Sequence, residues 1–516
     1  MLLCCTLCSV HHTNLTQPPN YPAQSTNMDP LKPLPAVEST KEGAVIKHYD
    51  YTRDDLKKDI EQQPDRFGSY AKVNPKEIAL VKKLDLYMMP VLWLMYFLNF
   101  LDRNAIVNGK LNHIDKDLGL VGSQYNTCVS IFFVGYITGQ VPSNMLVTRL
   151  KPSWYLSGWM LAWAIVSTLN CLVKDYHGLL AVRLVLGLTE APFYSGAVYL
   201  VSLFYTRKET ATRLALFYTG NLLASTFSGL IAAGVFAGLD GARGLAGWRW
   251  LFLIQGVFTF AVAIAGFFIL PDTPLKTGWL TEEERQLAHA RIVRDTTERR
   301  STRTSTWSGL WDAARDYRTW LFTLLTNLHL SANGFKNYLP TAVASLGFSN
   351  TISLVLTSPP YLVATFASVA VSWSSGHFNE RTWHITVSKT LAIVGFAVAT
   401  ATYNIGARYF AIVLFVGATY GVNNINLAWT AATIGQTDEK KAAALAIVNT
   451  FGNLSFVYTP YLWSDDTAPL FRPACLASIG FSFGVIVTAW VIKWILIRTN
   501  RKIRAQDSEA INFYVY

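Results

Sequence analysis

Charged residues are scarce in this chain of 516 residues, where Asp, Glu, Lys and Arg together make up 15% of the sequence. Soluble proteins average about a quarter. Apolar residues make up 51%, and they gather in long blocks separated by short polar connections. Blocks of about twenty apolar residues match a bilayer core roughly 30 Å thick. The composition therefore excludes one large soluble core and predicts a helical protein with many membrane spans.

Motifs for nucleotide or metal chemistry are also missing. No GxxxxGK[ST] phosphate-binding sequence occurs, so ATP is not expected to drive an activity. The six cysteines show no repeated CxxC and no Cys/His ligand spacing, so we expect no metal, no other cofactor and no structural disulfide. No histidine stands with a nucleophile or metal set at one depth, so no enzyme is predicted. The N-terminus lacks the basic residues of a signal peptide, and Met28 is an alternative start.

Polar stretches divide the chain into five parts. Residues 1–80 are predicted to form a disordered cytosolic tail, because they contain no sustained apolar period. Residues 81–270 and 320–498 are each expected to form a six-helix bundle. A basic cytosolic linker, 271–319, joins the bundles, and 499–516 form a cytosolic C-terminal tail.

Twelve transmembrane helices are predicted, so the fold class is an all-α membrane protein. The first bundle is expected to contain spans at residues 84–107, 124–147, 153–173, 178–204, 214–238 and 248–270. The second is expected to contain spans at 320–343, 352–375, 384–404, 408–434, 442–463 and 474–497. The short sequence Gly-Asn-Leu recurs at 220–222 and 452–454, in the fifth and eleventh spans. This recurrence supports a duplication of six spans.

The net charge of +11 would suggest a nucleic-acid partner in a soluble protein. Here the cations lie mainly in the tails and connecting segments, so they indicate membrane topology, and no nucleic-acid partner is expected. Both termini and the central linker are predicted to be cytosolic, in a monomer at the plasma membrane. The cations that decide this include Lys82, Lys83, Arg498, Arg501, Lys502, Arg504 and nine Lys or Arg residues between Lys276 and Arg318.

Charge inside a membrane span is expensive and therefore indicates a functional site, and five ionisable residues of the predicted spans are the most informative. They are Asp102, Arg103, Arg183, Glu190 and Lys336. Arg183 and Glu190 are two helical turns apart, so each needs another partner. The low dielectric of a bilayer favours the protonated form of a carboxyl group, so Glu190 is a candidate for proton coupling. The alternative is a polar clamp between helices.

Arg103 and Lys336 occupy comparable depths in the first span of each half. Two cations facing one cavity would attract a carboxylate, and we expect both to bind substrate. Alternatively, Asp102 partly neutralises Arg103, and Lys336 reaches the outer interface. Neutral hydrogen bonds to substrate, or between helices, could come from Asn104, Asn333, Asn337, Tyr361, Asn423, Asn424 and Asn426.

Four segments carry a resemblance to a known family: residues 98–106, 183–191, 358–361 and 452–463. Over roughly residues 75–500, the chain resembles the major facilitator superfamily, and within it the fungal allantoate permease branch of the anion:cation symporters. The resemblance implies two six-helix bundles rocking about a central site and proton-driven uptake of small organic anions. One departure is the absence of the usual acidic-basic loop between the second and third spans.

Residue roles follow from the same resemblance. Distant anion-transporter relatives place functional cations in helices 1, 4 and 7, which matches Arg103, Arg183 and Lys336. Together with the residue-level reasoning, this predicts a substrate site of Arg103, Asn104, Arg183, Lys336, Asn333, Tyr361 and Asn424, with Glu190 and Asp102 in proton coupling.

The leading functional hypothesis is a secondary transporter that couples protons to symport of a small organic anion. The first alternative is efflux of a secondary metabolite. A second alternative, of another class, is a membrane nutrient sensor that does not transport. A sensor would favour a long folded cytosolic domain, which neither tail supplies.

Overall fold

The computed structural model describes residues 75–146, 150–297, 306–378, 380–434 and 438–506. The chain divides into two units, Met1–Gln63 and Pro64–Tyr516, and every described residue belongs to the second. The described residues form helices and connecting turns, without a strand. The tail predicted over residues 1–80 lies outside the described residues as far as position 74, and its last six residues begin the first helix. The predicted C-terminal tail continues the last helix as far as Gln506, and its remaining residues lie outside the described part.

Six long helices make up the N-terminal half and lie at the first six predicted spans. They are α2 (Pro75–Gly109), α4 (Gln124–Leu146), α5 (Pro152–Leu169), α6 (Tyr176–Phe204), α7 (Arg207–Leu239) and α8 (Gly247–Ile269). Short turns η1 (Lys110–Asn112), α3 (Ile114–Asp117), η2 (Asn170–Leu172) and η3 (Ala242–Gly244) connect them. Polar caps set some of the starts: the Asp175 carboxylate accepts from the Gly178 N–H at the beginning of α6.

The segment between the halves contains η4 (Pro274–Lys276), α9 (Glu282–Thr297) and α10 (Thr306–Arg315). The sequence around Thr281 predicts a capping box, which the structure confirms. The Thr281 N–H donates to the Glu284 carboxylate at 2.9 Å, and the Glu284 N–H donates to the Thr281 hydroxyl at 3.3 Å. Arg291 of α9 then binds Glu77 of α2 and Glu209 of α7, each at 2.7 Å. These ion pairs dock α9 on the N-terminal half.

The C-terminal half differs because three of its six spans are interrupted. Its seventh to ninth spans are α11 (Tyr317–Ala332) with η6 (Gly334–Asn337) and α12 (Leu339–Ala344), α13 (Asn350–Leu356) with α14 (Ser358–His377), and α15 (Thr382–Ala401). The others are α16 (Ile405–Thr433), α17 (Asp438–Asn453) with α18 (Ser455–Tyr458) and η7 (Thr459–Leu462), and α19 (Arg472–Gln506), which η8 (Asp465–Thr467) precedes. Proline removes a backbone donor, and Pro340, Pro359 and Pro460 lie at these interruptions.

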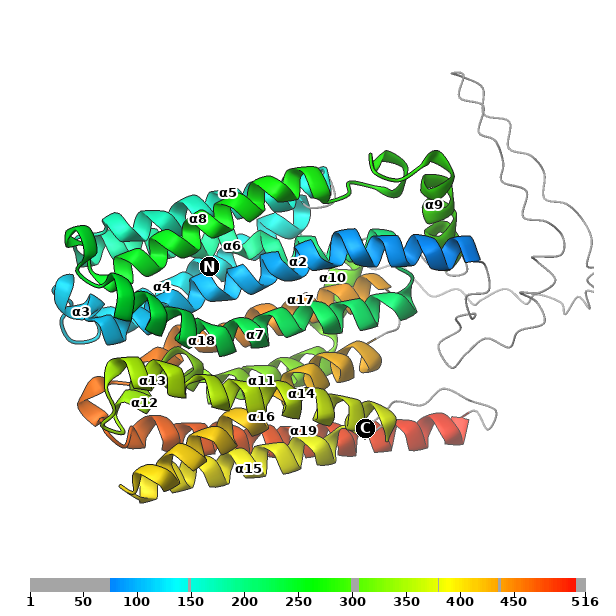
Figure 1. Ribbon diagram of the computed structural model, residues 1–516. Coiled ribbons are helices and arrows are strands. Elements are labelled where there is room, and N and C mark those ends of the chain that lie inside the picture. The colour runs from blue at the N-terminus through cyan, green and yellow to red at the C-terminus, as the bar shows by residue number, and fades with distance from the viewer. Residues whose placement is uncertain (1–74, 147–149, 298–305, 379, 435–437, 507–516) are drawn as a thin grey trace, which may run out of the picture. The chain divides into compact units, whose positions relative to one another are not determined.

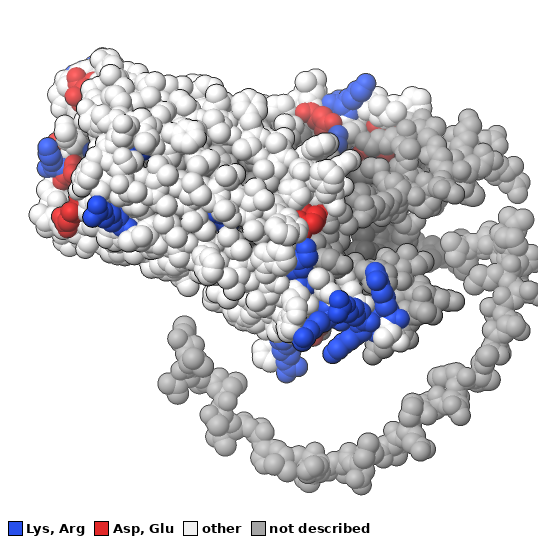
Figure 2. Space-filling view, turned by 90° about the horizontal axis from the view of Figure 1, so that it is seen from below, with Lys and Arg blue, Asp and Glu red and all other residues white. Residues whose placement is uncertain are grey.

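Ten described helices are long and apolar enough to cross a membrane. The other two spans are α4 and the interrupted segment from α11 to α12, so the described part of the chain contains twelve transmembrane helices. Seen from below, the charged side chains gather at the two ends of the described part and leave a broad band nearly free of them (Figure 2). This pattern matches a hydrocarbon layer around the helices.

The two halves lie one above the other in Figure 1, with the N-terminal half uppermost. We name the end that carries α9 and the last turns of α19 the linker end, and the end that carries α3 and α12 the far end. At the far end, Lys110 binds Asp465 at 2.8 Å, and the Tyr338 hydroxyl donates to Asn126 at 2.8 Å. The Asn350 amide also donates to the Leu111 carbonyl at 2.6 Å. These contacts join the halves at the far end.

Candidate substrate-binding site

A cavity of about 620 Å³ lies between the two halves. Its lining extends from Ile106, near the far end, to Leu214 and Ala442, close to the start of α7 and of α17. The cavity therefore reaches from the contacts of the far end toward the linker end. Among the predicted site residues, the lining includes Arg103, Asn104, Arg183, Glu190, Asn333, Lys336 and Tyr361.

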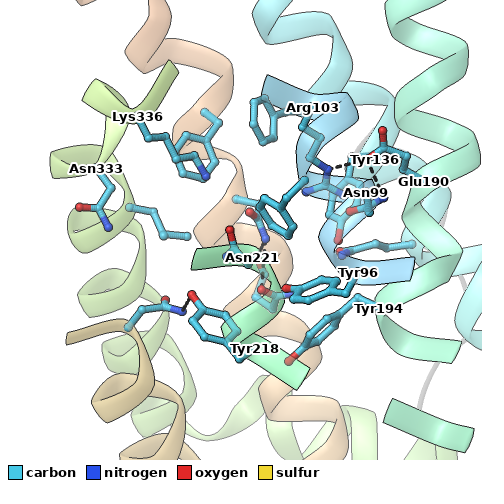
Figure 3. A pocket seen from close by; sticks show the side chains of 18 of the residues that line it. Tyr96, Asn99, Arg103, Tyr136, Glu190, Tyr194, Tyr218, Asn221, Asn333 and Lys336 are labelled. Atoms are coloured by element: carbon cyan, nitrogen blue, oxygen red, sulfur yellow. Dashed lines mark hydrogen bonds and ion pairs between the residues drawn. The ribbon is translucent and has the colours of Figure 1, made fainter. Parts of the chain in front are cut away.

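Arg103 of α2 forms an ion pair with Glu190 of α6 inside this cavity (Figure 3). The Arg103 Nε donates to Glu190 Oε2 at 2.5 Å, and Asn99 Nδ2 donates to the same oxygen at 3.0 Å. Asn99 and Arg103 reach one partner because residues four apart share a helix face. The second carboxylate oxygen, Oε1, has no hydrogen-bond partner among the described residues.

Aromatic rings surround the two arginines of the cavity. The Arg103 guanidinium carbon lies 4.6 Å from the ring centre of Tyr136 and 5.2 Å from that of Phe132. The Arg183 guanidinium carbon lies 4.7 Å from the centre of the Phe132 ring, and the Arg183 Nε donates to the Cys128 carbonyl at 3.5 Å. Arg183 is only 2% exposed. The rings replace part of the hydration that both cations lose on burial.

Lys336 lines the opposite side of the cavity, on η6, where the seventh span is interrupted (Figure 3). Its ammonium lies 3.7 Å from the ring centre of Phe456. No acidic side chain or hydrogen-bond acceptor binds this ammonium among the described residues. Neighbouring Asn333 shares a hydrogen bond of 3.1 Å with His329, one turn earlier on α11. The cavity thus holds a paired arginine from one half and a lysine without a counter-charge from the other.

Two residues of the predicted site lie elsewhere. Asp102 is absent from the cavity lining and accepts a hydrogen bond of 3.1 Å from Thr259 of α8. It is fully buried, and it forms no ion pair with Arg103, whose partner is Glu190. Asn424 is also absent from the lining, and its amide donates to Ser368 and Ser372 of α14. The reason is helical geometry, because adjacent residues point about 100° apart around the axis.

The sequence-based prediction missed several lining residues. Tyr96, Tyr136, Tyr194 and Tyr218 line the cavity, and none of them is among the predicted site residues. A signal for others was present in the repeated Gly-Asn-Leu sequence, because Asn221 and Asn453, the two repeat asparagines, both line the cavity. Equivalent positions of two duplicated halves meet at a shared axis, so a repeated polar residue in a span is a candidate for the cavity.

Twelve helices in two halves around a central cavity are typical of a membrane transporter. The chain belongs to the Major Facilitator Superfamily, whose family model matches residues 92–460. The chain is therefore a membrane transporter of this superfamily.

Curated relatives cover most of the chain. It is 34% identical to the MFS-type transporter cnsO of Penicillium expansum, over 82% of this chain and 84% of that protein. It is 30% identical to the major facilitator-type transporter hxnP of Emericella nidulans, over 84% of this chain and 89% of that protein. It is 29% identical to a protein of Agrobacterium vitis named as a candidate tartrate transporter, over 82% and 96%.

Solved structures show the same fold. A D-xylose-proton symporter superposes with a TM-score of 0.61 at 14% identity, over 78% of this chain and 96% of that one. A bacterial homologue of the human lysosomal transporter Spinster, in an inward-facing and occupied conformation, superposes with a TM-score of 0.60 at 16% identity, over 81% and 95%.

Proposed function

We propose that this protein is a proton-coupled symporter that carries a small organic anion across the plasma membrane. The observation that supports the proposal is the ion pair between Arg103 and Glu190 inside the cavity. It joins a group that can gain a proton to a group that can bind an anion. The resemblance to the anion:cation symporters and the tartrate named for the relative from Agrobacterium vitis also favour a carboxylate substrate.

Proton binding and substrate binding are coupled because Glu190 and the substrate carboxylate compete for Arg103. When Glu190 is ionised, it occupies the guanidinium and opposes the entry of another carboxylate. When Glu190 is protonated it is neutral, and a substrate carboxylate takes its place on Arg103. Proton and anion then bind together, and neither is carried alone.

The charges of the cavity suit an anion. Its lining contains three cations, Arg103, Arg183 and Lys336, and one acidic residue, Glu190. A positive cavity with low-dielectric walls concentrates anions and repels cations. Protonation of Glu190 removes its negative charge, so the net charge of the cavity rises by one unit. This increase balances the negative charge of a bound monoanion.

The orientation follows from the cations of the linker end. Lys82 and Lys83 of α2 lie at this end, as do Arg498, Arg501 and Lys502 of α19. An excess of Lys and Arg marks the cytosolic side, so the linker end and both termini face the cytosol. Because the cavity reaches toward the linker end, this conformation is the one that releases substrate inside. A tag on either terminus should become accessible to antibody only after permeabilisation, whereas a tag after Asp465 should be accessible on intact cells.

Uptake of radiolabelled carboxylates tests the function. The protein is expressed in yeast that lacks its own carboxylate permeases, and uptake is measured with and without a protonophore. We expect accumulation above the external concentration, and its loss with the protonophore. Accumulation that survives the protonophore would contradict proton coupling, and export from preloaded cells without uptake would favour the efflux alternative. The Glu190→Gln variant, expressed to the same surface level, is the matched control.

A further inference from the structure

The last helix carries three exposed cations close to its end, Arg498, Arg501 and Lys502. Lys and Arg side chains gather at the linker end in the space-filling view, and α19 ends there (Figures 1 and 2). No acidic side chain pairs with any of the three among the residues that the structure describes. They therefore present positive charge that no described residue balances.

Other cations at the linker end have a different role, because acidic side chains bind them. Lys83 of α2 binds Glu284 of α9 at 2.7 Å, and Arg213 of α7 binds Asp85 of α2 at 2.6 Å. These cations hold helices of the protein together. The three cations of α19 do not, so their charge is available to a partner outside the chain.

The cations of α19 continue an apolar stripe on the outer face of that helix. Positions three or four apart share one face of a helix, because each residue turns the chain by about 100°. Exposed side chains follow one another in such steps along α19 at Phe483, Val487, Trp490, Trp494, Arg498 and Arg501. One continuous face is thus apolar over its first four positions and basic over the next two. This order matches the change from hydrocarbon to phosphate on entering the headgroup layer of a bilayer.

The length of α19 places the cations at the depth of the headgroups. The helix extends about 33 Å from Arg472 to Trp494, close to the thickness of a hydrocarbon core of roughly 30 Å. Arg498 and Lys502 lie about 6 and 12 Å further along the axis. They are therefore expected beside lipid phosphates rather than in the hydrocarbon or far into the water.

Tryptophan rings lie next to these cations. Trp383 of α15 packs edge-on against Trp490, with 5.1 Å between the ring centres, and the Arg498 guanidinium carbon lies 3.5 Å from the ring centre of Trp494. Tryptophan is enriched where a membrane meets water. Stacking contacts only the face of a guanidinium and leaves its N–H edge able to donate to a phosphate.

We propose that the end of α19 is a docking site for an anionic phospholipid. The phosphate binds Arg498 and Arg501, a second acidic group of the head binds Lys502, and the acyl chains lie along the stripe from Phe483 to Trp494. The proposal goes beyond the proposed function, since no residue of α19 lines the cavity. The proposed orientation places this site in the cytosolic leaflet, where anionic lipids are concentrated.

Other occupants match only part of this surface. A nucleic acid or an acidic protein would match the charge, but it would leave the apolar part of the stripe unused. A second copy of this chain docked by the same face would bring like charges together, which opposes association. A phospholipid matches both parts at once.

Native mass spectrometry of the purified full-length protein in detergent tests the proposal. The protein is titrated with phosphatidylserine or with phosphatidylcholine of the same acyl chains, and the affinity for the first bound lipid is measured. The full chain retains Asp507 and Glu509, which follow α19 in the sequence. We expect phosphatidylserine to bind at least about tenfold more tightly, because each Lys or Arg near the headgroups adds to the attraction. Glycerophosphoserine, the head without acyl chains, should not displace it at equal concentration.

Two triple variants assign the preference to residues. Replacing Arg498, Arg501 and Lys502 by Gln should lower the preference for phosphatidylserine below about threefold. The matched control removes the same number of charges from exposed positions at the far end: Lys116→Gln, Lys174→Gln and Arg472→Gln. This control should keep the preference. Phosphatidylserine should also raise the melting temperature of the wild type and the control but not of the α19 variant, while all three proteins melt alike in phosphatidylcholine.

The results that would overturn the proposal differ from one another. Equal binding of the two lipids would show that the cations select no anionic lipid. An equal loss of preference in both triple variants would show that net charge, rather than the end of α19, attracts the lipid. Displacement by glycerophosphoserine at equal concentration would indicate a site for a soluble phosphate compound instead. Each of these results is independent of uptake, so anion transport is tested separately.

Discussion

The two halves of this protein differ in how they accommodate charge inside the membrane. In the N-terminal half, Arg103 and Glu190 form an ion pair with Asn99 as a third member. The C-terminal half carries Lys336 and Lys389 inside its spans, and no acidic residue occurs at positions 320–379, 381–437 or 440–464. The two halves therefore each contain six spans but differ in their ionisable residues.

This difference suggests that the N-terminal half exchanges the proton and that the C-terminal half helps to bind the anion. A carboxylate that can exchange a proton requires a nearby cation to stabilise its ionised form, and the N-terminal half supplies both. A cation without an internal acid can receive an anion whether Glu190 is protonated or not, and no acidic side chain binds Lys336 among the described residues. Lys389 is a contrasting case: it is fully buried, it is absent from the cavity lining, and its ammonium has no described partner.

Replacement of Arg103 should have the largest effect. Arg103→Ala should lower uptake at least about 100-fold, because the substrate loses a cation and Glu190 loses its partner. Removal of one member of a buried ion pair costs about 3–5 kcal/mol, so the amount of folded protein should fall too. The double variant Arg103→Ala/Glu190→Gln should recover surface protein without recovering uptake. Uptake is measured per amount of surface-labelled protein, and near-normal uptake in Arg103→Ala would remove this residue from the site.

Glu190→Gln separates the coupling role of the N-terminal half from substrate binding. Gln resembles the protonated form of Glu in shape and hydrogen bonding, but it cannot release or accept a proton. Exchange of internal for external substrate should continue, while accumulation should fall to about equal concentrations on the two sides. Exchange and accumulation are measured side by side on protein normalised to surface amount. Accumulation at the wild-type level would end the coupling hypothesis, and loss of both activities would indicate a structural clamp.

The ion pair between Lys110 and Asp465 joins the halves at the far end, and its removal should have a moderate effect. The Asp465 side chain is 58% exposed, so the pair contributes about 0.5–1 kcal/mol. Lys110→Ala should therefore raise the labelling rate of Ile106→Cys by an outside thiol reagent about two- to fivefold. Lys116→Ala, at an exposed position of α3, is the control. An unchanged labelling rate would show that this pair does not hold the far end closed.

Lys389→Met should have the smallest effect on transport and sharpen the contrast with Lys336. Met has a similar length and removes a buried amine that has no described partner, so the melting temperature should stay the same or rise by a few degrees. Uptake should stay within about twofold of wild type. Lys336→Met, measured in parallel by scanning fluorimetry and uptake, should lose uptake instead. A large loss of uptake in Lys389→Met would give this lysine a role in the transport cycle.

Much of the architecture could be predicted from local sequence. Apolar blocks located the twelve spans, and the capping box at Thr281 located the start of α9, because both depend on residues close together in the chain. The interruption of the seventh span at η6 was not predicted, because residues 320–343 were interpreted as one continuous helix although 331–337 are mostly polar. There the helix changes to a 3₁₀ turn next to Gly334 and before Pro340, and Lys336 lies on that turn.

By itself, the sequence determined which ionisable residues lie inside membrane spans, because residue type and approximate depth can both be obtained from it. It singled out Asp102, Arg103, Arg183, Glu190 and Lys336, and all of these except Asp102 line the cavity. Only the tertiary structure decided their partners. Glu190 lies 87 positions from Arg103 in the chain, and Phe133 meets Phe456 across the two halves. Such contacts depend on how separate helices turn their faces toward one another, which no local pattern contains.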